Sequence, residues 1–213
     1  MRRSKPARAF HPTRRPARPW GLYSFVPVAV VVGLCGVAAA GEIYRIDPVH
    51  TWVLFRIQHL GISYAYGRFR DVSGTLDLDE AAPERSSMRV EIGVDSIDTD
   101  NEKRDRHLRS ADFFDASKFP RITFRSTALR KVEDQTFDVT GNLSMHGVTK
   151  PATLRMKLTG VARPDPWGDH RAGFEGTTTI RRSDFNMNAI DAGAFGALGD
   201  DVQVTIAVEA VRR

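Results

Sequence analysis

Histidines are the residues of this chain best suited to acid–base or metal chemistry, because the single cysteine, Cys35, lies in an apolar stretch near the N-terminus. The five histidines beyond that stretch are His50, His59, His107, His146 and His170. No two of them are four residues apart, and the chain has no His-Glu-x-x-His segment, so the spacing of a zinc-binding helix is missing. The sequence therefore predicts no metal centre. Without a thiol beyond residue 40, it also predicts no disulfide and no thiol nucleophile.

Basic residues gather around one of these histidines. Arg104, Arg106 and Arg109 flank His107, and a cationic helix face can bind a phosphate or a carboxylate. A charge run of this kind is more commonly a solvated face with nearby aspartates as partners. Two other histidines lie near predicted strand ends, where they would either contact a polar head group or serve as ordinary structural histidines. The candidate head-group residues are His59, His107, Arg109 and His146.

Nucleophilic catalysis finds little support in the sequence. Ser110 and Ser183 are available, but neither lies in a Gly-x-Ser-x-Gly turn, and no triad spacing is present. The glycines near the C-terminus follow neither the Rossmann nor the P-loop pattern. We therefore expect a protein that is not an enzyme and has no cofactor. A hydrolase that depends on Ser110 or His107 is the alternative in this class.

The elements that must position these residues are predicted to be strands. Eight segments alternate apolar and polar residues, which places apolar side chains on one face of a sheet and polar ones on the other. Eight strands with almost no helix between them predict an all-β fold, an antiparallel sheet closed into a barrel. The predicted strands cover residues 50–59, 66–79, 87–95, 121–129, 136–145, 151–161, 172–181 and 201–211.

Glycines interrupt two of these strands. Gly67 and Gly74 lie in the second and Gly141 in the fifth, and glycine within a strand often marks a bulge or a sharp bend. We therefore expect the barrel to turn its corners there.

One short helix interrupts the strand pattern. Thr99 and Glu102 have the spacing of a capping box, which predicts a helix of two to three turns over Lys103–Ala111. Three phenylalanines follow between residues 112 and 120. They are expected either to cover one end of the barrel or to pack the helix onto the sheet.

The alternation also predicts which apolar side chains point into the barrel. Periodicity does not distinguish side chains that fill a core from side chains that line a cavity, and a one-residue slip would exchange the two faces. The candidate lining residues are Val53, Phe55, Ile57, Leu76, Leu78, Met88, Val90, Ile92, Val94, Ile122, Phe124, Phe137, Val139, Leu143, Met145, Leu154, Met156, Phe174, Val204 and Ile206.

The N-terminal segment differs from the rest of the chain. Seven basic residues precede the first acidic residue, Glu42, and an apolar run from Leu22 to Ala40 follows them. This pattern predicts a signal peptide over residues 1–40, cleaved near Ala40, and one domain over residues 41–213. An uncleaved membrane anchor is the alternative, since about 20 apolar residues can span a bilayer.

Net charge argues against a nucleic-acid partner. The whole chain has 31 Lys and Arg against 26 Asp and Glu, a net charge of +5. Without the seven N-terminal basic residues, 24 basic residues face 26 acidic ones, a net charge of −2.

Several segments resemble the YceI-like family of bacterial periplasmic proteins. They include Tyr44–His50 (YRIDPVH), His107–Asp115 (HLRSADFFD), Gly147–Pro151 (GVTKP) and Arg182–Phe185 (RSDF). The resemblance covers essentially the whole predicted domain. It implies a lipocalin-like, eight-stranded antiparallel barrel with one helix alongside, and an apolar tunnel that holds an isoprenoid chain or another long amphiphile.

The resemblance therefore favours a lined cavity over a filled core. The expected function is periplasmic transport or storage of an isoprenoid lipid or quinone, with an inner-membrane protein as a further expected partner. The alternative is a stress-linked periplasmic interaction module with a packed barrel.

Overall fold

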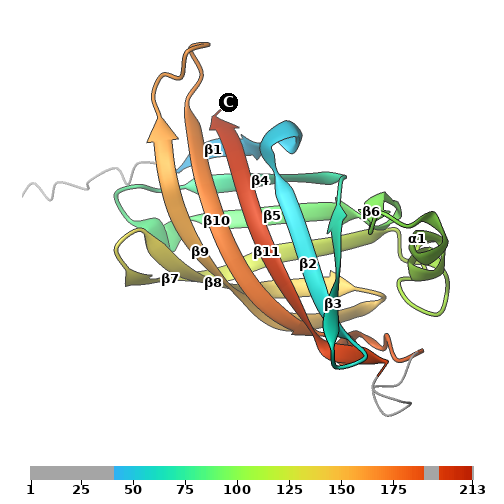
Figure 1. The fold of residues 1–213 in the computed structure, drawn as a ribbon. Helices are drawn as coiled ribbons and strands as arrows, with labels where there is room; N and C mark the ends of the chain where they lie inside the picture. Colours follow the sequence, from blue (N-terminus) through green and yellow to red (C-terminus); the bar gives the residue numbers. More distant parts are fainter. Residues whose placement is uncertain (1–40, 190–196, 213) are drawn as a thin grey trace, which may run out of the picture. The chain divides into compact units, whose positions relative to one another are not determined.

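The computed structural model describes residues 41–189 and 197–212 (Figure 1). The predicted signal peptide, its cleavage site and the alternative anchor lie outside the described residues. Within the described ranges, no helix is long and apolar enough to cross a membrane.

Antiparallel strands account for most of this part of the chain. They are β1 (Glu42–Ile46), β2 (Trp52–His59), β3 (Ser63–Phe69), β4 (Val72–Leu78), β5 (Ser87–Gly93), β6 (Ile97–Asp98), β7 (Arg121–Glu133), β8 (Thr136–Met145), β9 (Val148–Ala162), β10 (Arg171–Arg181) and β11 (Leu198–Arg212). Short 3-10 turns at Pro48–His50, Pro83–Arg85, Val94–Ser96 and Arg182–Phe185 connect several of them.

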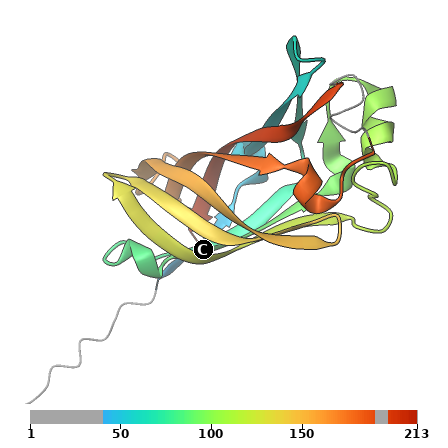
Figure 2. The ribbon, with the colours of Figure 1, turned by 90° about the horizontal axis from the view of Figure 1, so that it is seen from below.

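Eight of these strands form a closed ring in the order β1-β4-β5-β7-β8-β9-β10-β11, and the pairing of β1 with β11 completes it. Figure 2 shows the ring from below. The strand β11 pairs with β1 through its last residues and with β2 through its first ones. From β2 the sheet continues to β3 and then to β6, beside the helix α1 (Glu102–Arg109). The predicted all-β barrel of eight antiparallel strands with one short helix is thus confirmed.

Two details of the predicted strands were wrong. The segment 66–79 is two strands, β3 and β4, because the chain turns at Arg70 and Asp71, where Asp71 accepts a backbone hydrogen bond from Gly93. The strand predicted over 87–95 ends at Gly93, and Val94 begins a 3-10 turn. The strand β1, too short to show a clear alternation, was not predicted.

The helix α1 was placed almost correctly, but its N-cap was not. The side chain of Asn101, and not of Thr99, caps the helix by accepting a hydrogen bond from the backbone N–H of Arg104, at 3.0 Å. Both the backbone N–H and the hydroxyl of Thr99 donate to the buried carboxylate of Asp105 instead. These bonds attach α1 to the end of β6.

One part of the barrel interior is solidly packed. Tyr44 and Ala210, on the two strands of the β1–β11 closure, are fully buried, and Leu76, Val139 and Ala172 are buried with them. Close packing of these side chains closes the barrel at this end. The rest of the interior differs, and it forms the site described next.

Candidate functional site

A cavity of about 370 Å³ occupies the barrel interior between the packed end and α1. Small-molecule sites commonly have volumes of roughly 300–1,000 Å³. Most of the side chains around it are apolar and come from alternate positions of the strands, as the period-two pattern requires. The predicted residues that line this cavity are Val53, Phe55, Ile57, Met88, Val90, Ile92, Ile122, Phe124, Leu143, Met145, Leu154, Met156, Val204 and Ile206.

Six predicted lining residues lie elsewhere. Leu76, Leu78, Val139, Phe137 and Phe174 pack with the core but do not line the cavity, and we assign them to the packed end. The sixth, Val94, is almost fully buried in the 3-10 turn after β5 and not in a strand. Alternation identifies the inner face of a strand, but it does not locate the cavity along that strand.

The wall next to α1 is aromatic, and it was only partly anticipated. Phe113 and Phe114, in the loop after the helix, both line the cavity together with Leu108 of α1. The ring of Phe114 packs edge-on against Phe69 with centroids 5.8 Å apart, and Phe69 packs against Phe55 at 5.6 Å. The helix and its loop therefore pack onto the sheet and also cover the cavity, so the two expectations for these phenylalanines are compatible.

Other wall residues lie outside the candidate lining set. Ile180, Val202 and Val208 are at positions that the alternation also places on the inner face, whereas the pattern did not indicate Ile46, Ala65, Val72, Thr178, Met187 and Leu198.

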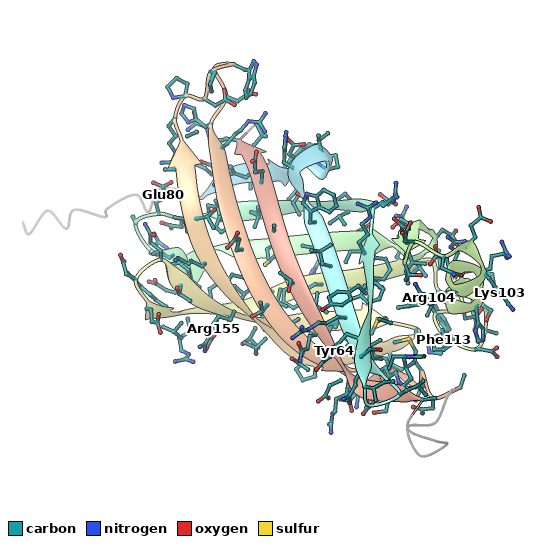
Figure 3. All side chains as sticks on the ribbon, viewed as in Figure 1. Tyr64, Glu80, Lys103, Arg104, Phe113 and Arg155 are labelled. Carbon is teal, nitrogen blue, oxygen red and sulfur yellow. The ribbon has the colours of Figure 1, made fainter. Side chains whose placement is uncertain are left out.

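Polar side chains meet the cavity on the side of α1. His59, Tyr66, Arg104 and His107 line it and are themselves exposed, so the cavity reaches the surface there; we call this group the mouth. Figure 3 shows Arg104 and Phe113 close to the strands and Lys103 on the outer side of α1. The mouth thus combines an apolar interior with cationic and hydrogen-bonding groups at its rim.

Arg104 has a defined orientation at the mouth. Its Nε donates to the hydroxyl of Thr99 at 2.7 Å, and one terminal nitrogen donates to the Thr99 carbonyl at 2.6 Å. From the sequence, Arg104 was expected only as one of the basic residues that flank His107. Its position in the first turn of α1, three residues after the capping Asn101, is the signal that would have placed it beside the barrel.

The four predicted head-group residues separate into two pairs. His59 and His107 belong to the mouth. Arg109 donates instead to the carbonyls of Asp95 and Ile97, which fixes α1 to the turn before β6. His146 bonds to the carbonyl of Phe185 at 2.8 Å, and its ring packs against Phe119.

One charged side chain is buried in the cavity wall. Arg182, the first residue of the RSDF segment, is 5% exposed and donates to the carbonyls of Met187 and Gly199. Its guanidinium thereby connects the turn after β10 to the start of β11. A guanidinium whose N–H groups donate hydrogen bonds to carbonyls in this way can be buried without a large cost. This explains why an arginine lies in a mostly apolar wall.

Ser110 and His107 do not form a nucleophile–base pair in this structure. The Ser110 hydroxyl donates to the backbone carbonyl of His107 at 2.7 Å, as part of the end of α1. The imidazole of His107 contacts the carboxylate of Asp112 at 3.0 Å and packs edge-on against Phe113. The geometry places Ser110 in the C-terminal end of α1 and His107 at the mouth.

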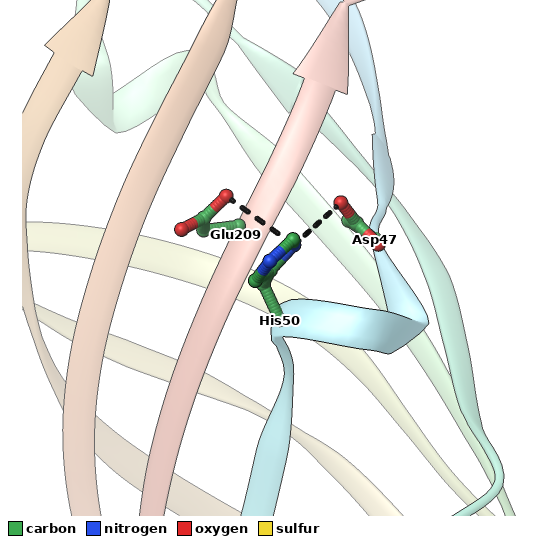
Figure 4. Close-up of side chains that lie close together, drawn as sticks. All are labelled: Asp47, His50 and Glu209. Carbon is green, nitrogen blue, oxygen red and sulfur yellow. Dashed lines mark hydrogen bonds and ion pairs between the residues drawn. The ribbon is translucent and has the colours of Figure 1, made fainter.

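Outside the barrel, Asp47, His50 and Glu209 lie close together (Figure 4). His50 Nδ1 is 3.0 Å from Asp47 and 3.9 Å from Glu209. The hydrogen bond from His50, supported by one from Arg171, lowers the pKa of Asp47 to about 2. The Arg171 guanidinium is 2.8 Å from Asp47 and 3.5 Å from Glu209, so both carboxylates are already paired with a positively charged side chain. We interpret the group as an ion-pair cluster and not as a metal site.

The fold and the site together define a class: an antiparallel barrel with a closed end, an apolar interior and a polar mouth beside a helix. The family model for the YceI-like domain matches residues 44–210. The chain therefore belongs to the YceI-like family.

Curated and solved relatives agree with this assignment. The chain is 46% identical over 180 residues to Protein YceI of Salmonella arizonae, covering 84% of this chain and 91% of that protein. The YceI protein of Campylobacter jejuni superposes with a TM-score of 0.65 at 34% identity, covering 73% of this chain and 90% of that one. A polyisoprenoid-binding domain from Saccharophagus degradans has the same fold, with a TM-score of 0.64 at 16% identity, over 80% of this chain and 98% of that domain.

Proposed function

We propose that this protein is a non-enzymatic binding protein that holds an isoprenoid lipid, a quinone or a similar long amphiphile inside its barrel. The observation that carries the proposal is the cavity, whose wall is mostly apolar along the strands, with polar side chains near the mouth and at Thr178 and Arg182. The name of the Saccharophagus domain, which shares the fold, supports the same ligand class.

The energetics suit an apolar tail. Burying ten methylene equivalents contributes roughly 8 kcal/mol at about 0.8 kcal/mol each. That free energy corresponds to a dissociation constant near 1 μM before the cost of ordering the ligand is subtracted. An exposed ion pair with a head group adds only about 0–1 kcal/mol. The tail therefore sets the affinity, while His59, Arg104 and His107 select the head group and its orientation.

The alternative, an interaction module with a packed barrel, predicts that methionines and Phe137 fill the interior. Met88, Met145 and Met156 instead lie in the cavity wall, and Phe137 belongs to the packed end. The open volume favours the binding protein over this alternative.

The proposed location is the periplasm, where such a protein would store an isoprenoid lipid or carry it between membranes, with an inner-membrane protein as donor or acceptor. The apolar run before residue 41 and the absence of cysteine after it support this location. A polyprenyl chain does not cross an aqueous compartment unaided, so its transfer between two membranes would require a protein that shields it from water.

The decisive experiment is native mass spectrometry of protein purified from the periplasmic fraction. We expect a co-purifying hydrophobic mass. Protein that is uniformly empty and also takes up no prenyl chain from added polyprenyl phosphate or quinone would overturn the proposal.

Two variants locate the ligand. Phe55→Asp places a charge in the cavity wall and is expected to abolish uptake. Leu54→Asp, at the neighbouring exposed position on the outer face of β2, is the matched control and should retain it. Ile92→Phe adds apolar volume to the cavity without a charge, so the barrel should still fold. Reduced uptake by a folded Ile92→Phe protein would show that filling the cavity, and not misfolding, prevents ligand binding.

A further inference from the structure

The connection between β2 and β3 exposes apolar side chains beside the mouth. Ile62 at the turn is 84% exposed, Leu60 is 48% exposed, and Tyr64 and Tyr66 of β3 are 45% and 60% exposed. We call these four residues the tip patch. Its neighbours belong to the cavity: His59 and Ala65 line it, and the N–H of Leu60 donates to the carbonyl of Ala197, next to the lining residue Leu198.

Leu60 occupies this exposed position at a conformational cost. Its φ is 54° and that of Gly61 is 70°, and the N–H of Ile62 donates to the carbonyl of His59. The three-residue connection therefore contains a turn with positive φ at both central positions. Asn or Gly is the usual residue at the first of these positions, since a leucine there is sterically disfavoured. A leucine that is strained and also half exposed contributes little to folding, so its presence points to a function outside the barrel.

The hairpin that carries the tip patch is basic, whereas Asp200 and Asp201 lie at the start of β11, which pairs with the end of β2. The chain has no acidic residue between Asp47 and Asp71, whereas it has Arg56, Arg68 and Arg70 there. The last two pair with Asp98. Arg56 instead donates to the uncharged amide of Gln203, and its guanidinium lies 4.6 Å from the Tyr64 ring centroid. Its charge therefore remains available beside the exposed apolar side chains.

Apolar tips flanked by tyrosine and arginine suit the boundary between water and lipid. Tyrosines are enriched at that boundary, because the ring is apolar and the hydroxyl is polar. Each basic residue near an anionic bilayer contributes attraction that weakens with added salt. A second copy of this chain fits the patch poorly, because a two-fold contact would bring Arg56 of each copy together, and four side chains on a hairpin tip are few for a stable interface.

We propose that the tip patch docks the protein on an anionic lipid bilayer and holds the cavity mouth at the lipid surface. The inference rests on the proposed function, because a carrier of a membrane lipid must exchange it where its mouth meets the bilayer. The inserted residues are Leu60 and Ile62, with Tyr64, Tyr66 and Arg56 at the level of the head groups.

The test is co-sedimentation of the protein, as secreted and processed by the cell, with vesicles of phosphatidylcholine that contain phosphatidylglycerol. We expect binding that falls with added salt and is weaker to vesicles of phosphatidylcholine alone. Ile62→Ser should lower the partition coefficient by at least about tenfold, since the transfer of a buried isoleucine side chain is lost. Trp167→Ser is the matched control, because Trp167 is 80% exposed in the β9–β10 connection, on the opposite side of the barrel in Figure 1, and its removal should leave binding unchanged.

A second variant separates docking from folding. Leu60→Asn gives the turn its preferred sequence, Asn-Gly, so the melting temperature should hold or rise while vesicle binding falls. Failure of the unmodified protein to bind the anionic vesicles, or equal losses in Ile62→Ser and Trp167→Ser, would overturn the inference. So would a dimer in solution that Ile62→Ser converts to monomer without an effect on vesicles.

Ligand uptake from solution keeps the two proposals apart. Ile62→Ser should still take up polyprenyl phosphate, because its side chain does not line the cavity. An unmodified protein that binds vesicles through the tip patch but takes up no prenyl chain would remove the proposed function and leave the docking surface in place.

Discussion

Gly67 of β3 lies directly under the ring of Phe55, its cross-strand partner on β2. A methyl group on Gly67 would overlap that ring and would also crowd the side chain of Thr99, which holds Arg104 at the mouth. The register between β2 and β3 is regular, so of the bulge and the sharp bend expected at this glycine, the bulge is excluded. The missing side chain provides the space in which Phe55 forms part of the cavity wall.

Gly67→Ala is therefore expected to impair both stability and uptake. Overpacking of this kind commonly costs about 1–3 kcal/mol, and relief of the overlap would push the Phe55 ring into the cavity. Thermal unfolding and uptake of a quinone would measure the two effects. Gly160→Ala is the control, because a methyl group at Gly160 meets nothing within 4 Å. Equal behaviour of the two variants would show that the Phe55 ring has other space available.

Local patterns predicted the barrel well because the period of a strand is visible in one short segment. Val90 and Ile92 alternate with charged residues on β5, and both line the cavity. The same pattern holds for Leu76 on β4, which packs in the closed end. Whether an inward side chain meets open volume or another side chain depends on how far away the opposite wall of the barrel lies. The pattern of residues within one strand does not indicate that distance.

The mouth was harder to predict for a related reason. Arg104 and Phe113 reach the cavity only because α1 is attached to β6 through Thr99 and Asp105. The sequence predicted the helix but not the face that it turns toward the barrel. The position of His146 is also set by a distant segment, since its imidazole bonds to the carbonyl of Phe185, 39 positions away in the chain.

Shortening a side chain should have different effects in the packed end of the barrel and in the cavity wall. Leu76→Ala removes packed contacts and is expected to cost about 2–5 kcal/mol of unfolding free energy, as large-to-small changes in cores do. Ile92→Ala removes a side chain that faces open volume, so it should cost less but weaken ligand binding. Urea unfolding and quinone titration would measure both quantities. A larger stability loss for Ile92→Ala than for Leu76→Ala would contradict the division of the interior into a packed end and a cavity.

Arg171 is expected to stabilise the barrel by joining separate segments. It bonds to Asp47 before β2 at 2.8 Å and to Asp165 in the β9–β10 connection at 2.6 Å. Arg171→Met would leave the nearly buried Asp165 carboxylate without its cation, which is far more costly than breaking an exposed pair. The melting temperature should fall clearly. Arg106→Met, which breaks the exposed pair with Glu102, is the control and should change stability by less than about 1 kcal/mol.

The carboxyl of Asp47 should make part of the stability depend on pH in the acid range. Hydrogen bonds from His50 and Arg171 lower its pKa from 3.8 to about 2 in the folded protein. A carboxyl with a lowered folded pKa stabilises the fold above its unfolded pKa, and this contribution is lost as the pH falls toward the folded value. The difference in unfolding free energy between the unmodified protein and Asp47→Asn should therefore be largest above about pH 4 and shrink as the pH falls toward about 2.

Urea unfolding at a series of pH values measures this difference directly, because the other carboxyls titrate in both proteins and cancel to first order. Asp134→Asn, which breaks an exposed pair with Lys131, is the control and should show a small difference at every pH. A difference for Asp47→Asn that stayed constant down to the lowest pH would mean that the carboxylate stabilises the turn before β2 by shape and hydrogen bonding alone. Its charge would then contribute nothing to the cluster with Arg171.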